Sequence, residues 1–495
     1  METLSDLIRV VNKKRISKID VLDKTFLNSK SENLYYKLYN AIESGKISTD
    51  EEAAQLVYGT NKTDPRYKML KSRLKDKVLK SVMLLDVDDA FNNEVGKAYY
   101  ECLTHLQIIE IIIKFTGTTI LVVKLIKENY SKSVKYKFYD ILSKYSYYLI
   151  IYYSFKGDKR SLNLEEKKFI KYVDLEQKEK IAKCLYSKAV VGFESGDPIT
   201  NDLISDTKEN LDKLYVFSVE IKTPDVDFHY IYLAFMFYEI SNDFEKLLEI
   251  CNSAEVLLKN NSSYITYTRK FAILYYKSVA FLYLKKYKEG LRLIDNTTID
   301  IPETNYNWFV LNEVKFKLYL QFQRISETYG IYKIVVSNKS FNRQVVQITE
   351  KWKIYYAYLV FMDNYLNNGD YKFNLPKFLN DVPINSKDKS GFNFAIRIIE
   401  ILFLFAHKKY NVVFAKMEAL RIYRSRYLND NTYKRNHLFL SLLLKAEKTG
   451  FDSSLMQKAD WKEIKLLNER NNIIADWEII PYETLWDIFV ELAKK

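Results

Sequence analysis

Apolar residues recur every three or four positions along most of this chain, the spacing of one face of an α-helix. After Pro65, for example, Tyr67, Leu70, Leu74 and Val78 fall on one stripe. The strict alternation of apolar and polar residues that marks a half-buried strand does not persist anywhere. Only 12 glycines and 7 prolines interrupt 495 residues. The pattern therefore predicts an all-α protein of long helices joined by short connections.

Start and stop signals are clearest in the first ninety residues. Ser48 and Thr49 are each followed three residues later by a glutamate, which is the spacing of a capping box, and Gly59 is a natural stop for the helix they open. The next helix is predicted to open with Asp64 as its cap and Pro65 at its first position. These signals predict an N-terminal helical module.

One arrangement recurs in the second half of the chain. An apolar helix is followed by a two- or three-residue polar break, then by a large apolar or aromatic residue, and then by a second apolar helix. The residues after the breaks are Phe244, Tyr287, Ile325, Tyr371 and Tyr410. They lie between 38 and 46 residues apart. This recurrence predicts an array of helix pairs of unequal length.

Two of these segments resemble tetratricopeptide repeats. An aromatic residue precedes the break by about one turn at Tyr238 and Phe281, and another follows it at Phe244 and Tyr287. The resemblance extends over about residues 225–427. It implies a right-handed superhelix of antiparallel helix pairs, with a concave groove lined by the first helix of each pair. Such a groove is expected to bind a protein or peptide.

If the register of these repeats is right, a small set of side chains faces the groove. These residues are His229, Tyr232, Met236, Glu239, Tyr275 and Leu282. The alternative interpretation is that the Tyr and Met side chains simply belong to the core. Within the second repeat, Gly290 is predicted to lie where the two helices approach closely, because it follows Tyr287 by three residues.

The punctuation divides the chain into four predicted segments. These are an N-terminal helical module (1–90), long-helix hairpins (91–200), the repeats (201–450) and a C-terminal helical cap (451–495). Within the last segment, a break at Pro481 precedes a helix with an apolar face. That helix is expected either to cover the open end of the last repeat or to dock on a partner.

The formal net charge of +13 raises nucleic-acid binding as an alternative function. Residues 48–80 resemble the helix-turn-helix of sigma-factor-like regulators, and the basic helix 64–84 would supply the contacts. Its candidate residues are Arg66, Lys68, Lys71, Arg73, Lys75 and Lys77. A second basic stretch offers Arg421 and Arg424 on one helix face. AT-rich coding bias and solvated helix faces explain the same lysines without any such partner.

Signatures of catalysis are absent from the sequence. There is no Gly-x-Ser-x-Gly elbow, no phosphate-binding Gly-x4-Gly-Lys-Ser/Thr loop and no metal-ligand cluster beyond the close pair Cys102 and His105. We therefore expect no enzyme activity, no cofactor, no metal and no small-molecule ligand. Three widely spaced cysteines and an N-terminus unlike a signal peptide indicate the cytoplasm.

The most apolar window, residues 106–126, contains three charged residues, and we expect it to form a helix pair or one bent helix and no membrane contact. The sequence thus predicts a non-catalytic scaffold or adaptor that binds a protein or peptide. By analogy alone, it would be the recognition subunit of a bacterial regulatory or defence assembly.

Overall fold

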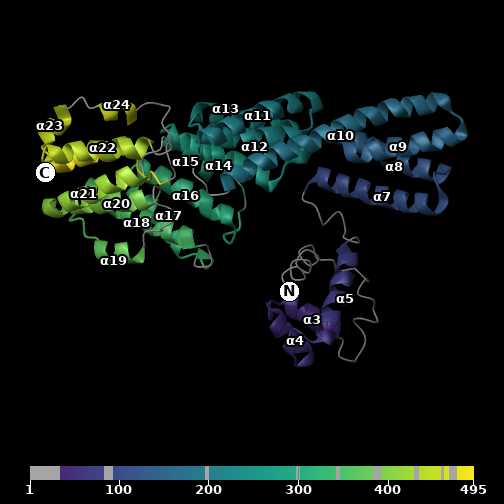
Figure 1. The fold of residues 1–495 in the computed structure, drawn as a ribbon, viewed down its shortest axis with the longest axis horizontal. Coiled ribbons are helices and arrows are strands. Elements are labelled where there is room, and N and C mark those ends of the chain that lie inside the picture. Colours follow the sequence, from purple (N-terminus) through teal and green to yellow (C-terminus); the bar gives the residue numbers. More distant parts are fainter. Residues whose placement is uncertain are drawn as a thin grey trace. The chain divides into compact units, whose positions relative to one another are not determined.

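A computed structural model describes residues 34–82, 93–194, 200–296, 299, 301–341, 346–382, 392–427, 434–458, 462–467 and 477–494. All regular elements among these residues are helices, so the all-α prediction is confirmed (Figure 1). The chain forms two compact units, unit 1 (residues 1–176) and unit 2 (residues 177–495). The border falls inside α10 (Lys159–Glu194), within the segment predicted as long-helix hairpins.

The N-terminal helices are α3 (Leu34–Glu43), α4 (Asp50–Tyr58) and α5 (Pro65–Val82). The capping box forms at the second of the two predicted pairs, since the Glu52 N–H donates to Thr49 Oγ1 (3.3 Å) and the Thr49 N–H donates to Glu52 Oε2 (3.0 Å). Gly59 ends α4 in a left-handed conformation, and Asp64 Oδ1 accepts the Arg66 N–H (2.8 Å) at the start of α5. The predicted stripe on α5 packs into the core of this module. That core comprises Leu38, Ile42, Ala53, Ala54, Val57, Tyr67, Leu70, Leu74 and Val78.

The rest of unit 1 is an antiparallel array of α7 (Glu94–Thr116), α8 (Ile120–Lys135), α9 (Tyr139–Lys156) and the first half of α10. The apolar window 106–126 forms two helices that separate at Gly117. Among the described helices, none combines the length and the apolar character needed to cross a bilayer.

Unit 2 continues with helices joined by short connections. Its first part consists of α11 (Asn201–Ile221), α12 (Pro224–Ile240), α13 (Phe244–Asn260), α14 (Tyr267–Tyr283), α15 (Tyr287–Asp295), α16 (Tyr306–Gln321), α17 (Ile325–Val336) and α18 (Val346–Leu366). Its second part consists of α19 (Leu375–Asp381), α20 (Phe392–Ala406), α21 (Tyr410–Tyr427), α22 (Lys434–Lys448), α23 (Ser453–Lys458), α24 (Lys462–Leu467) and α25 (Tyr482–Lys494).

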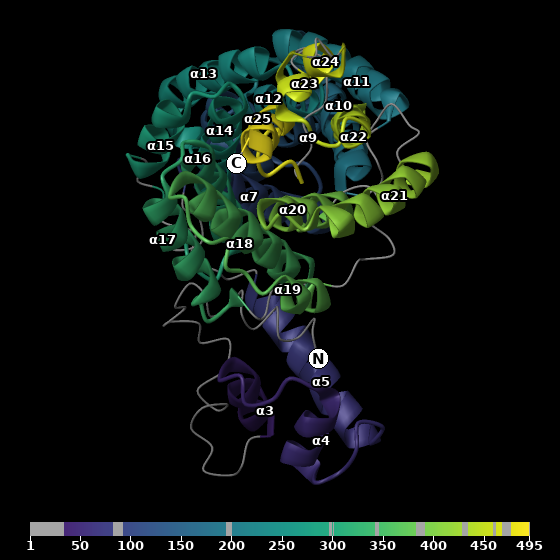
Figure 2. The same cartoon turned by 90° about the vertical axis from the view of Figure 1, so that its left-hand side faces the viewer.

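The helices of unit 2 pack in sequence order and in two layers. Each helix from α11 to α18 contacts the next. In addition, α12 contacts α14 and α14 contacts α16, although α13 and α15 separate them in the sequence. We call α12, α14 and α16 the inner layer. In Figure 2 the helices of unit 2 follow an arc, and α25 lies on its inner side.

The same backbone joint connects the two helices within each helix pair. A non-glycine residue takes a left-handed conformation at Asn242, Lys285, Gln323 and Lys408, with φ between 54° and 58°. The residue after it donates its N–H to the carbonyl five positions back, as from Lys286 to Phe281 (2.8 Å), which satisfies an otherwise unpaired helix-end carbonyl. The next helix begins one residue later. This places the predicted residues Phe244, Tyr287, Ile325 and Tyr410 at the first positions of α13, α15, α17 and α21.

The prediction for Tyr371 is wrong, because this residue lies in an irregular segment between α18 and α19. The Asn364 side chain accepts the Tyr371 N–H (2.8 Å), and Tyr371 itself has a φ of +50°. The next helix starts only at Leu375, where the Asn374 side chain caps it. The joint itself still forms, since Asn368 has a φ of +49° and the Gly369 N–H donates to the Asn364 carbonyl (2.8 Å), but no helix follows until Leu375.

The predicted close approach at Gly290 is present. A Cβ atom built on Gly290 would lie 3.2 Å from Phe281 Cβ on α14 and 3.0 Å from Leu318 Cδ2 on α16. Three helices therefore meet where only a hydrogen atom fits without movement of a neighbour.

Candidate functional site

Residues 477–494, which we call the C-terminal segment, lie against helices from far earlier in the chain. The Gln321 side chain donates to the Ile479 carbonyl (3.1 Å), Lys285 Nζ lies 3.5 Å from Glu483 Oε1, and the Tyr365 hydroxyl donates to Glu491. Its apolar side chains are buried. They are Tyr482, Leu485, Trp486, Ile488, Phe489, Val490 and Leu492. The segment thus shares one core with α16 to α22.

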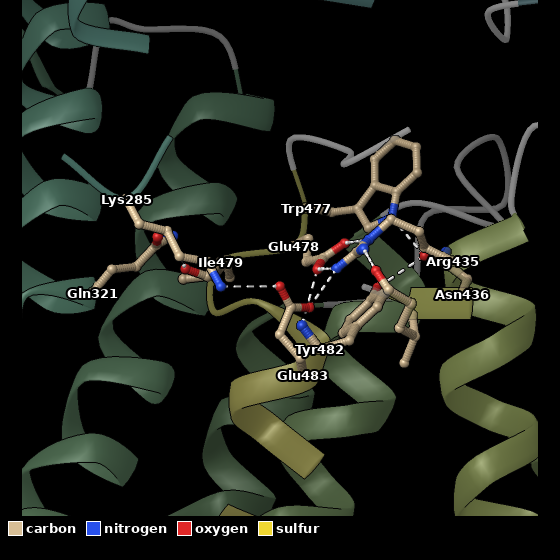
Figure 3. Close-up of polar contacts among 10 residues, drawn as sticks. Lys285, Gln321, Arg435, Asn436, Trp477, Glu478, Ile479, Tyr482 and Glu483 are labelled. Atoms are coloured by element: carbon tan, nitrogen blue, oxygen red, sulfur yellow. Dashed lines mark hydrogen bonds and ion pairs between the residues drawn. The ribbon is translucent and has the colours of Figure 1, made fainter. Parts of the chain in front are cut away.

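Arg435 of α22 donates three hydrogen bonds to the segment and a fourth to the end of α24 (Figure 3). Its Nε donates to Glu478 Oε2 (2.9 Å), its Nη1 to the Leu467 carbonyl (2.7 Å), and its Nη2 both to Glu478 Oε1 and to Glu483 Oε2 (2.7 Å). Glu478 Oε1 also accepts the Tyr482 N–H (2.9 Å) at the start of α25. One cation therefore joins α22, the end of α24 and both carboxylates of the segment.

The two carboxylates respond differently to their surroundings. Burial raises the pKa of the Glu478 carboxyl above its ordinary value, although the Arg435 guanidinium opposes that shift. Burial acts in the same direction on Glu483, but the charge of Arg435 outweighs it and lowers the pKa. Burial disfavours the charged form of the Glu478 carboxyl, and the ion pair with Arg435 offsets this desolvation cost.

The same helix, α22, also holds the segment through aromatic stacking and hydrogen bonds to a side-chain amide. Asn436 Oδ1 accepts from the Tyr482 hydroxyl (2.8 Å) and from Trp477 Nε1 (3.4 Å). The Tyr482 ring stacks on Phe439 with centroids 4.6 Å apart. This surface therefore receives a helical polypeptide that carries acidic and aromatic side chains.

The predicted groove residues mostly lie at half-buried positions of the inner layer. His229, Tyr232, Met236 and Glu239 on α12 and Tyr275 on α14 are neither fully buried nor fully exposed. Leu282 differs, because it is only 2% exposed and packs in the core of these repeats. A residue at that depth cannot contact a partner, and the apolar stripe of α14 did not reveal which of its members would be covered.

An aromatic cluster surrounds the α12 residues. The Tyr186 ring of α10 lies 5.2 Å from the His229 ring and 6.1 Å from the Tyr232 ring. Burial lowers the pKa of His229, so its imidazole is neutral at pH 7, and burial raises the pKa of Tyr232 to about 12. The Arg269 guanidinium lies 4.1 Å from the centre of the Phe228 ring at the edge of this cluster. Such a surface can stack on aromatic or apolar groups and accept or donate hydrogen bonds.

The predicted nucleic-acid contacts on α5 fall into two groups. Arg66 is 2.8 Å from Asp64, and Lys71 is 2.7 Å from Asp50, so both cations already have acidic partners. The remaining members of the set are exposed. They are Lys68, Arg73, Lys75 and Lys77.

The second predicted basic pair has a packing role. Arg421 on α21 bonds Glu418 (2.8 Å) and also pairs with Glu447 of α22. Arg424 donates to Ser441 Oγ (3.2 Å), again linking α21 to α22. The sequence pattern did not single out Arg435, which binds Glu478. Nothing local distinguishes Arg435, because its partner Glu478 lies 43 positions away.

In the described part of the chain, no three or more His, Cys, Asp or Glu side chains lie close enough together to bind a metal ion. His105, part of the one close Cys and His pair, instead lies 3.4 Å from Glu128, and Cys102 is buried.

No protein-family model, curated protein or solved structure matches this chain.

Proposed function

We propose that this chain is a non-catalytic scaffold whose unit 2 is a tetratricopeptide-like superhelix that binds a protein or peptide along its inner layer. The recurrent joint before α13, α15, α17 and α21 supports the repeat, since the same backbone conformation joins the two helices in each of four pairs. Repeated pairs of this kind bury their faces against their neighbours and leave one extended surface for recognition.

The observation that carries the proposal is the seating of the C-terminal segment. Its contacts with Lys285, Gln321 and Tyr365 mean that the inner side already holds a helical polypeptide, here supplied by the chain itself. The half-buried aromatic cluster around His229 and Tyr232 extends the inner layer toward α10. Rigid aromatic side chains in partly desolvated surroundings are the usual anchors of such interfaces.

The experiment is site-specific photo-crosslinking in the native cell. A photoreactive phenylalanine analogue replaces Met236 in one variant and Val256, an exposed residue of α13 outside the inner layer, in a matched control. We expect one defined protein adduct from position 236 that disappears when Tyr232→Ala is added, and none from position 256. Equal crosslinking from both positions, or none from position 236, would count against this surface.

Nucleic-acid binding through α5 is the second candidate function. It is favoured by the exposure of Lys68, Arg73 and Lys75 on a helix whose opposite face is buried. Phosphate contacts predict an affinity for random duplex DNA that falls steeply with salt. Charge reversal at Arg73 and Lys75 should remove that binding, whereas no binding at low salt would exclude this function.

The adaptor role belongs to the same proposal. A scaffold with a partner-binding inner layer would serve as the recognition subunit of a bacterial regulatory or defence assembly in the cytoplasm. Fold-level analogy alone supports this setting.

A further inference from the structure

The two most exposed large apolar side chains of the described residues lie in unit 1. Phe115, in the last turn of α7, and Phe155, in the last turn of α9, are each 85% exposed. Isolated exposed apolar residues are common, but phenylalanine at this exposure is costly in water unless something covers it.

Both phenylalanines lie at the same end of the helix array. Lys144 Nζ and the Tyr148 hydroxyl of α9 donate to Glu110 of α7 (2.9 and 3.2 Å), and the Tyr99 hydroxyl of α7 donates to Asp140 of α9 (2.6 Å). These contacts place α7 and α9 side by side and parallel, with a nearly constant offset. The C-terminal turns of α7 and α9 therefore lie at one end, together with the first turns of α8 and α10.

Further exposed apolar side chains gather at that end. The set, which we call the apolar tip, is Ile111, Phe115, Ile120, Leu121, Phe155 and Leu164. Short connections at Gly117 and Gly157 carry the chain from one helix to the next within the tip. Contiguous exposed apolar surface of this kind marks an interaction site.

The rim of the apolar tip is positively charged. Its exposed cations are Lys114, Lys124, Lys156, Lys159 and Arg160. The acidic residue among them, Asp158, is engaged at the start of α10, where its carboxylate accepts the Ser161 N–H (3.0 Å). A second copy of the same tip would be repelled by this rim, so the charge favours a negatively charged occupant.

We propose that the apolar tip docks on an anionic lipid surface. Aromatic and aliphatic side chains at helix ends can enter the headgroup region without a cavity to receive them, and the surrounding Lys and Arg side chains bind anionic headgroups. The expectation of no membrane contact rested on the lack of a spanning segment, and surface docking requires none. This inference is independent of the proposed inner-layer function.

The test is flotation of the full chain with vesicles of phosphatidylcholine alone or with about one third phosphatidylglycerol. We expect binding only to the anionic vesicles, with affinity falling as salt rises. Phe115→Ser with Phe155→Ser, and separately Lys156→Glu with Lys159→Glu, should each reduce the affinity by about tenfold or more. The exposed positions of these side chains keep the fold intact, which thermal unfolding verifies.

Matched controls change exposed positions elsewhere in the chain. Tyr306→Ser removes an exposed aromatic side chain from α16, and Lys333→Glu with Lys339→Glu makes the same change of net charge as the tip variant. Both should bind vesicles like the wild type. The proposal is overturned if the wild type binds neither vesicle, or if the controls lose as much binding as the tip variants. Tip-dependent self-association without vesicle binding would likewise overturn it, and would assign the tip to a contact between copies of the chain.

Discussion

Arg435 of α22 and Glu478 of the C-terminal segment form a bidentate ion pair, and their side chains are only 4% and 1% exposed. The pair joins residues that are 43 positions apart and closes the inner side of unit 2 around its own C-terminal segment. Removal of one member of a buried pair leaves the other charge desolvated, which costs far more than removal of both.

Arg435→Met should therefore lower the free energy of unfolding by about 3 to 5 kcal/mol. The double variant Arg435→Met with Glu478→Leu should recover a large part of that loss, because no desolvated Glu478 carboxylate remains. Urea denaturation of both variants measures the difference. Lys246→Met, at an exposed ion pair with Glu249, is the control and should cost about 1 kcal/mol or less. Equal losses in the single and double variants would contradict a charge-based role.

Gly290→Leu should destabilise the repeats by about 1 to 3 kcal/mol, because its side chain would collide with Phe281 and Leu318. Gly330 provides a matched control, since it also lies within a helix but a Cβ there meets nothing within 4 Å. Gly330→Leu should be neutral or slightly stabilising, as glycine is a poor helix former. A thermal melt compares the two, and an unchanged midpoint for Gly290→Leu would refute the close approach.

Asp50 should contribute stability that is lost in acid. Burial raises the pKa of its carboxyl, but hydrogen bonds from Lys71 and Tyr67 outweigh that effect and lower the pKa to about 2. Because the folded pKa is depressed, the contribution is complete above about pH 4 and disappears as the pH falls toward 2. After allowance for solvent screening it amounts to about 1 kcal/mol.

The measurement for Asp50 is the gap in unfolding free energy between the wild type and Asp50→Asn. That gap should narrow as the pH falls from 5 to 3. Gln55→Ala, at an exposed position of the same helix without an ionisable side chain, should show a small gap that does not change with pH. A constant gap for Asp50→Asn would show that the carboxylate gains nothing from its partners in the fold.

The three cysteines should differ sharply in reactivity. Burial raises the pKa of the Cys102 and Cys251 thiols, whereas Cys184 is exposed. A disulfide-exchange reagent should therefore modify one thiol rapidly in the native protein and all three after denaturation. Cys184→Ser should abolish the rapid phase, and a remaining rapid phase would mean that a buried site opens readily.

The local architecture could be predicted from the sequence because its determinants are local. The capping box at Thr49, the stop at Gly59, and four of the five predicted helix starts depend on neighbouring residues and were confirmed. The helix start expected at Tyr371 is displaced to Leu375, because the Asn364 side chain, seven residues earlier, accepts the Tyr371 N–H.

The arrangement of the candidate site depends on distant residues and was only partly predictable. The apolar face of α25 was foreseen, and Leu485 and Phe489 are buried as expected. Its docking surface was not foreseen, because that surface is assembled from the ends of α14, α16 and α18. For the same reason the sequence could suggest His229 and Tyr232 as groove residues but could not show that Leu282 is covered.

The late position of the C-terminal segment has a consequence for synthesis in the cell. Gln321 leaves the ribosome 158 residues before Ile479, its hydrogen-bond partner. At typical elongation rates this corresponds to a delay of about 10 to 30 s, far longer than helix pairs need to form. During that interval the nascent repeats expose the apolar surface that α25 later covers, which makes them a natural substrate for cotranslational chaperones.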